Sequence, residues 1–156
     1  MFDSILSYFF PAIILSLIIS VIYFFFEKRK IIENYTVSNS KHLKNINGLI
    51  ISDSGSLKKK IQLCSFDLLI NDNTIFIFPN SFYIIPMRKI NLNFSNSDKK
   101  LTRSTILLRE LMVNNQSVDL ISYPNYLQSK GRIIRLQNLT NEQISIFEEI
   151  KKNKNY

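Results

Sequence analysis

The sequence predicts a mainly β domain of about seven antiparallel strands capped by one C-terminal amphipathic helix, preceded by a single transmembrane helix. Three observations support this fold class. An uncharged run of 22 residues, from Ile5 to Phe26, lies near the start of the chain. Short apolar segments separated by turn residues follow from Ile46 onward. A capping motif and apolar residues at helical spacing come last, between Leu139 and Lys152.

The first run is long enough to cross a membrane as a helix. Its 22 residues reach about 33 Å as a helix, and the hydrocarbon core of a bilayer is about 30 Å thick. A cleaved signal peptide would have a positive start, a shorter apolar stretch and a small-residue cleavage site, and this run has none of the three. A buried core helix is the other alternative, but a small domain rarely surrounds a helix that is apolar on every face. Pro11 either kinks the helix or marks its true start.

Positive charge follows the run and is missing before it. Lys28, Arg29 and Lys30 lie just after it, whereas residues 1–26 contain no Lys or Arg. Because positively charged flanks stay in the cytoplasm, we expect the N-terminus outside and residues 27–156 in the cytoplasm. A topology signal alone explains this basic membrane flank.

Composition divides the chain into three parts. Residues 1–30 hold the anchor and its basic flank, residues 31–45 a linker, and residues 46–153 one domain of ordinary size. The linker fits both an extended chain and an interfacial helix. Residues 27–156 contain all 20 Lys and Arg and 11 of the 12 acidic residues, so their net charge is +9. This charge suits an anionic membrane face or nucleic acid, although a coding bias toward Lys, Asn and Ile explains it too.

The middle of the chain alternates between apolar runs and turn residues. In one run the apolar parity switches near Cys64 and Ser65, which predicts a bulge or bend. Ile90, Leu92 and Phe94 alternate with polar residues, which predicts a strand with one buried and one solvated face. The segment 58–71 is expected as one long strand or as two. The other expected strands cover residues 48–51, 74–78, 81–85, 90–94, 104–113, 117–123 and 127–136.

Turn residues separate these strands. Residues 71–73 and 114–116 predict hairpins, because Asn and Asp tolerate left-handed backbone dihedrals. Pro79 and Asn80 predict a turn that ends one strand, and Pro86 stops the next. The aromatic residues of these two strands alternate with isoleucines and are expected in the core; they are Phe76, Phe78, Phe82 and Tyr83.

A helix is expected over residues 141–152. Thr140 and Gln143 match the capping box S/T-x-x-E/Q, and Leu139 and Ile144 occupy the positions of a hydrophobic staple. Glutamates come early in this segment and lysines late, which suits the helix dipole. Its apolar face is made by Ile144, Phe147 and Ile150, with Ile146 beside them.

This order of strands and one final helix is that of a pleckstrin-homology-like (PH-like) barrel. Residues 66–79, Phe-Asp-Leu-Leu-Ile-Asn-Asp-Asn-Thr-Ile-Phe-Ile-Phe-Pro, resemble the central hairpin of bacterial PH-like and GRAM-like domains. Residues 81–86 resemble the short aromatic strand that follows it, and residues 139–144 resemble the start of the final helix. The resemblance covers residues 46–152 and implies a binding module for lipid headgroups or for peptide and protein partners.

The resemblance also implies basic residues around the first strand, loop and strand, where this chain has Lys58, Lys59 and Lys60. The family pattern includes an Arg on the second strand, whereas this chain has Ile-Gln-Leu at residues 61–63. A diffuse attraction to anionic lipid is therefore expected rather than a phosphoinositide-specific site. A solvated strand edge explains the same lysines. The other candidate lipid- or partner-binding residues flank a later loop and are Lys99, Lys100 and Arg103.

The residues do not predict catalysis, a metal site or a cofactor. His42 has no second His and no clustered Cys with which to bind zinc. Cys64 lies in an apolar strand and is interpreted as a small buried hydrophobic residue rather than a nucleophile. Three Gly residues make no phosphate-cradling loop, and Glu148 and Glu149 diverge on a helix. We therefore expect that the protein is not an enzyme.

Together these patterns predict a single-pass membrane protein whose cytoplasmic domain is a non-catalytic binding module at the membrane surface. Its expected ligand is a protein partner or anionic lipid. Nucleic acid is not expected, because the aromatic residues that would stack on bases are assigned to the core. The alternative is a small structural subunit of a membrane protein complex. Since the tether alone brings the domain to the membrane, lipid binding is not required for localisation.

Overall fold

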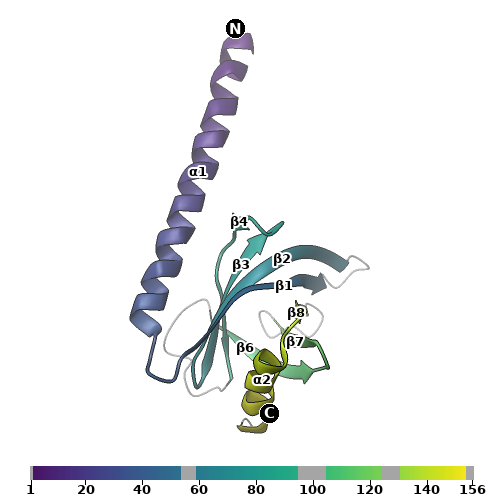
Figure 1. Cartoon of the computed structure of the whole chain (residues 1–156). Coiled ribbons are helices and arrows are strands. Elements are labelled where there is room, and N and C mark those ends of the chain that lie inside the picture. Colours follow the sequence, from purple (N-terminus) through teal and green to yellow (C-terminus); the bar gives the residue numbers. More distant parts are fainter. Residues whose placement is uncertain (1, 54–58, 95–104, 124–130, 154–156) are drawn as a thin grey trace. The chain divides into compact units, whose positions relative to one another are not determined.

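The computed structural model describes residues 2–53, 59–94, 105–123 and 131–153 (Figure 1). The chain forms two compact units, Met1–Tyr35 and Thr36–Tyr156. The first unit is a single helix, and the second contains a β-barrel and a short C-terminal helix. The mainly β fold expected for the second unit is therefore confirmed.

Helix α1 runs from Phe2 to Tyr35 without interruption, and Pro11 lies inside it. Among the described residues, its segment Phe9–Tyr35 is the one helix long and apolar enough to cross a membrane. None of the most apolar part of that segment is buried in the protein. The helix continues beyond the apolar run, and Arg29 pairs there with Glu33 at 2.8 Å, a spacing that supports helix.

The connection from α1 to the barrel is short. Strand β1 begins at Lys41, so residues 36–40 join the two elements. Within this connection the backbone N–H of Ser40 donates to the carbonyl of Val37 at 2.9 Å. The segment expected as a linker, residues 31–45, is therefore helix at its start and strand at its end.

Seven of the described strands close into a barrel in the order β2-β1-β8-β7-β6-β5-β3, with β3 pairing back to β2. Strand β4 pairs with the end of β3. The expected antiparallel arrangement is wrong for β5 and β6, which pair parallel, whereas the other described pairings are antiparallel. The strands are β1 (Lys41–Asp53), β2 (Lys59–Ile70), β3 (Thr74–Ser81), β4 (Ile85–Pro86), β5 (Ile90–Asn93), β6 (Thr105–Val113), β7 (Ser117–Ser122) and β8 (Arg132–Gln137).

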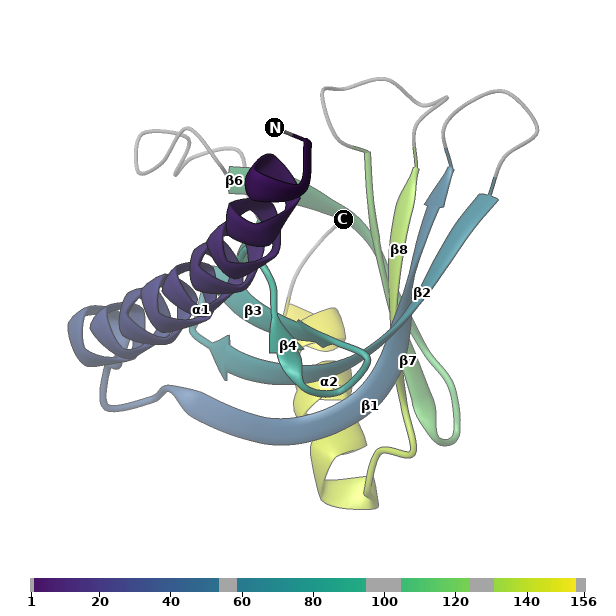
Figure 2. The same ribbon diagram turned by 90° about the horizontal axis from the view of Figure 1, so that it is seen from above.

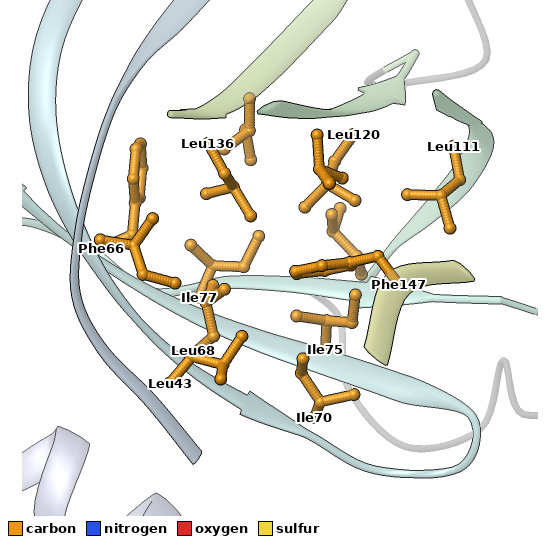
Figure 3. Packing of buried hydrophobic residues seen from close by; sticks show 14 of the residues in the cluster. Leu43, Phe66, Leu68, Ile70, Ile75, Ile77, Leu111, Leu120, Leu136 and Phe147 are labelled. Atoms are coloured by element: carbon orange, nitrogen blue, oxygen red, sulfur yellow. The ribbon is translucent and has the colours of Figure 1, made fainter. Parts of the chain in front are cut away.

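Helix α2 (Asn141–Asn153) packs against β6 and β7 and contributes to the barrel core. Figure 3 shows the ring of Phe147 extending from α2 toward Ile75 and Leu120. The capping box is confirmed, since the Thr140 N–H donates to Gln143 Oε1 at 3.0 Å. In return the Gln143 N–H donates to Thr140 Oγ1 at 3.3 Å. Two orphan donors of the first turn are thereby satisfied.

The bulge expected at Cys64 and Ser65 is wrong. Strand β2 keeps a continuous register there with both neighbours, and the irregularity lies in β1, between Leu43 and Ile46. The apolar parity switches for a different reason. Cys64 points into the core, whereas Ile61 and Leu63, on the opposite parity, are exposed on the outside of the barrel.

The turn expected at Pro79 and Asn80 is also wrong. Strand β3 continues to Ser81, and the chain turns at residues 82–84. Pro79 is tolerated because it lies between the part of β3 that pairs with β5 and the part that pairs with β4. Phe82 and Tyr83 are consequently exposed rather than in the core, while Phe76 and Phe78 are buried.

Strand β5 is buried on both faces, not on one as its alternating pattern predicts. Its two polar residues, Asn91 and Asn93, are both buried. The side chain of Thr74 on β3 donates to Asn93 Oδ1 at 3.0 Å. A hydrogen bond inside the protein therefore replaces water for Asn93.

Candidate interaction surface

Four neighbouring strands carry a row of isoleucines on the outside of the barrel. The register places Ile61 of β2 opposite Ile51 of β1, and Ile51 opposite Ile133 of β8. Ile133 in turn lies opposite Ile121 of β7. Strands β2, β1, β8 and β7 form one wall of the barrel, seen from above in Figure 2. Ile61 is 64% exposed and the other three are half-buried, so this isoleucine row is an apolar strip on the surface.

The adjacent row begins apolar and ends in an ion pair. Leu63 lies opposite Leu49, and Leu49 lies opposite Arg135. Arg135 binds Asp119 with two contacts, Nε to Oδ1 at 2.8 Å and an amino nitrogen to Oδ2 at 2.7 Å. This hydrogen bonding, together with the negative charge of Asp119, raises the pKa of Arg135 above its ordinary value. The bidentate pair gives the apolar surface a polar boundary over β7 and β8.

The turn between β3 and β4 extends the apolar surface beyond β2. Its backbone contacts β2 directly, since the Phe82 N–H donates to the carbonyl of Leu63 at 3.1 Å. Four consecutive apolar residues, Phe82 to Ile85, are exposed here, and Ile84 is 82% exposed. We call residues 82–85 the apolar turn.

Two of the predicted basic residues lie on the same strand as Ile61. Lys59 and Lys60 begin β2 and are both exposed. Lys28, Arg29 and Lys30, which the sequence predicts to flank a membrane span, lie on α1. The remaining candidates fall outside the residues that the structure describes; they are Lys58, Lys99, Lys100 and Arg103.

A polar cleft of about 490 Å³ lies between α2 and the β2–β3 turn. Lys41 Nζ contacts Glu149 Oε2 at 2.7 Å in this cleft, and the contact lowers the pKa of the Glu149 carboxyl. Ser40 Oγ donates to Asn71 Oδ1 at 2.7 Å beside it. The cleft is lined by Asn39, Lys41, Ile70, Asn71, Asp72, Asn73, Ile146, Glu149, Ile150 and Asn153.

The residues considered for chemistry lie apart from one another. Cys64 is fully buried in β2, and burial raises the pKa of its thiol. His42 lies in β1, not in a linker, and its Nε2 is 3.4 Å from Thr36 Oγ1. Within the described ranges, no three His, Cys, Asp or Glu side chains gather where they could hold a metal ion.

No protein-family model and no curated protein sequence matches this chain. The candidate surface therefore rests on the structure itself. Sequence reasoning missed Ile61, Leu63 and the apolar turn as surface residues. The available signal was the parity switch at Cys64, which also fits two apolar residues that face outward on a straight strand.

Proposed function

We propose that the protein is a membrane-anchored, non-catalytic binding module that acts at the cytoplasmic membrane surface. The observation that carries this proposal is the joining of a helix long enough to cross a membrane to a folded barrel by residues 36–40. Five extended residues span at most about 18 Å, so the connection between the two is short. The basic residues 28–30 favour a cytoplasmic barrel.

A PH-like identity for the barrel belongs to this proposal. A closed barrel of seven strands and a helix that follows the last strand support it, since the sequence resemblance implies both features; the parallel pairing of β5 with β6 departs from the expected antiparallel strands. Ile144 and Phe147 direct the apolar face of α2 into the core, while Glu148 and Lys151 are exposed. An amphipathic helix that covers part of the barrel fits these exposures.

Limited proteolysis tests the anchor and its orientation. In sealed membrane vesicles with the cytoplasmic face outward, protease should degrade residues 36–156; in vesicles of the opposite orientation it should leave them intact. The chain should also remain in the membrane pellet after an alkaline carbonate wash. Protection in the first vesicles would reverse the orientation, and release by carbonate would exclude the anchor.

Anionic lipid is one candidate ligand of the module. Residues 36–156 should float with anionic vesicles and dissociate as salt is raised, because screening weakens exposed charge contacts. Replacing Lys58, Lys59 and Lys60 by Glu should abolish the binding, whereas replacing Lys151 and Lys152 of α2 by Glu should change it less. Unchanged binding after the triple replacement would exclude these lysines as the lipid contact.

A structural subunit of a membrane complex is the second candidate function, and the isoleucine row favours it. A contiguous apolar strip on a protein surface often marks a contact with another macromolecule. A photo-crosslinking side chain at Ile133 in the full-length protein should give one discrete adduct in native membranes. The same side chain at Met112, which is exposed on β6, should not. Equal adducts from both positions would contradict a specific contact.

A further inference from the structure

The apolar turn holds its side chains in solvent with an unusual backbone. Phe82 and Tyr83 have φ angles of 48° and 67°, in the left-handed region that bulky residues rarely adopt. Three hydrogen bonds hold the segment in place. The Phe82 N–H donates to Leu63, the Ile84 N–H to Ser81 at 3.1 Å, and the Met87 N–H to Pro79 at 2.9 Å. Such strained conformations persist where the surrounding structure determines them, often at ligand contacts.

The turn forms one surface with the outer residues of β2. Phe82 and Ile84 are 68% and 82% exposed, and Ile61 and Leu63 beside them are 64% and 49% exposed. Because the backbone N–H of Phe82 donates to the carbonyl of Leu63, the turn lies directly beside the part of β2 that carries Leu63 and Ile61. The set combines aromatic and aliphatic side chains, as segments at a membrane–water interface do.

The charges beside this surface are mostly positive. Lys59 and Lys60 precede Ile61 on β2, and Arg88 follows β4; all three are exposed. Residues 79–89 contain no Asp or Glu, and the nearest acidic residue in the β1–β2 register is Asp53, opposite Lys59. Lysine is depleted in protein–protein interfaces, whereas cationic residues beside apolar side chains suit anionic lipid.

We propose that the apolar turn inserts into the interface of the bilayer that α1 spans, with Lys59, Lys60 and Arg88 on the anionic headgroups. This inference rests on the proposed function, because the anchor supplies the high local concentration of lipid. The barrel is thus held at the membrane in two ways, covalently through α1 and non-covalently through the apolar turn. The contact holds the barrel in a defined orientation at the bilayer surface.

Tryptophan fluorescence tests the insertion cleanly, because the chain contains no Trp. Full-length protein is placed in vesicles of phosphatidylcholine and phosphatidylserine, with and without bromine on the acyl chains. Tyr83→Trp reports on the turn, and Met112→Trp is its matched control, since the two native side chains are 49% and 48% exposed. Strand β5 is antiparallel to β3 and parallel to β6, so β3 and β6 run in opposite directions. Met112, near the end of β6, therefore lies at the opposite end of the barrel from the apolar turn, which follows the end of β3.

We expect brominated lipid to quench the tryptophan fluorescence of Tyr83→Trp, and we expect the emission of this variant to shift to the blue. Neither effect is expected for Met112→Trp. Replacing Lys59, Lys60 and Arg88 by Glu in the Tyr83→Trp protein should reduce the quenching. If the quenching and emission of Tyr83→Trp match those of Met112→Trp, the proposal is overturned. A contact with a protein partner would then explain the exposed apolar turn. Leu17→Trp, in the middle of the apolar run, separates this failure from failure of the anchor. Quenching of Leu17→Trp alone removes the insertion but keeps the anchor, whereas no quenching at either position removes both.

Discussion

Gly48 marks the place in β1 where the barrel leaves no room for a side chain. A Cβ there would overlap the carbonyl oxygen of Arg135 and lie 2.9 Å from the ring of Phe66. Because one neighbour is backbone and the other a core ring, Gly48→Ala should lower the free energy of unfolding by about 1–3 kcal/mol. Urea denaturation of residues 36–156 measures the loss.

Gly131→Ala is the control for this substitution. A Cβ at Gly131 would meet the ring of Tyr123 at 3.6 Å, which is ordinary contact, so its effect should stay within about 0.5 kcal/mol. If both substitutions lower the free energy of unfolding equally, the close approach of β1 and β8 at Gly48 does not explain the loss in Gly48→Ala.

Cys64 is the only cysteine of the chain, so its thiol reports on the barrel without interference. Burial raises its pKa above the ordinary 9.0, and the thiolate is the reactive form. Iodoacetamide at pH 9 should therefore modify folded protein far more slowly than protein in urea. By linkage, the contribution of this thiol to stability is fully present below pH 9 and is lost as pH rises through the folded pKa.

The neighbouring residue provides the contrast for that measurement. In a Cys64→Ala background, Leu63→Cys places the thiol on the exposed side of the same strand, where the native side chain is 49% exposed. It should react at close to the rate of the unfolded chain. Similar slow rates at both positions would contradict the outward orientation of Leu63 and with it the apolar surface.

Helix α2 begins with two reciprocal hydrogen bonds between Thr140 and Gln143, and one substitution removes one of them. Thr140→Ala deletes the acceptor of the Gln143 N–H, which should cost about 1 kcal/mol of unfolding free energy. Ser145→Ala is the control, because the exposed Ser145 Oγ donates to the Glu142 carbonyl of its own helix and does not cap the helix. Urea denaturation compares the two variants, and an equal cost would show that the cap contributes nothing specific.

Elements with local signals could be predicted, and α2 is the clearest example. The capping box of Thr140 and Gln143 depends on a few adjacent residues, which the sequence displays directly. Strands β2 and β3 needed non-local information. Whether Ile61 points inward or outward depends on the pairing of β2 with β1 and β3, and Pro79 is tolerated in β3 only because β4 and β5 leave a gap beside it.

At the scale of the whole molecule, the candidate surface could not be predicted either, because it depends on the pairing of strands that are distant in the sequence. The isoleucine row joins residues of β2, β1, β8 and β7 that lie up to 82 positions apart, from Ile51 to Ile133. The polar cleft likewise depends on Lys41 meeting Glu149 across 108 positions. Periodicity assigns such residues to a strand or helix but does not say which of them become neighbours. The long apolar helix α1 could be predicted because an uninterrupted apolar run of this length displays it directly in the sequence.

The barrel should fold without α1. Its described core cluster extends from Leu43 to Phe147 and includes no described residue of α1. Residues 36–156 should therefore unfold in one cooperative transition in urea and give a mainly β circular-dichroism spectrum. Phe147→Ala, which empties a fully buried position, should lower the free energy of unfolding by about 3–5 kcal/mol and move the whole transition. A mainly helical spectrum, or loss of α2 alone in that variant, would contradict a barrel whose core α2 shares.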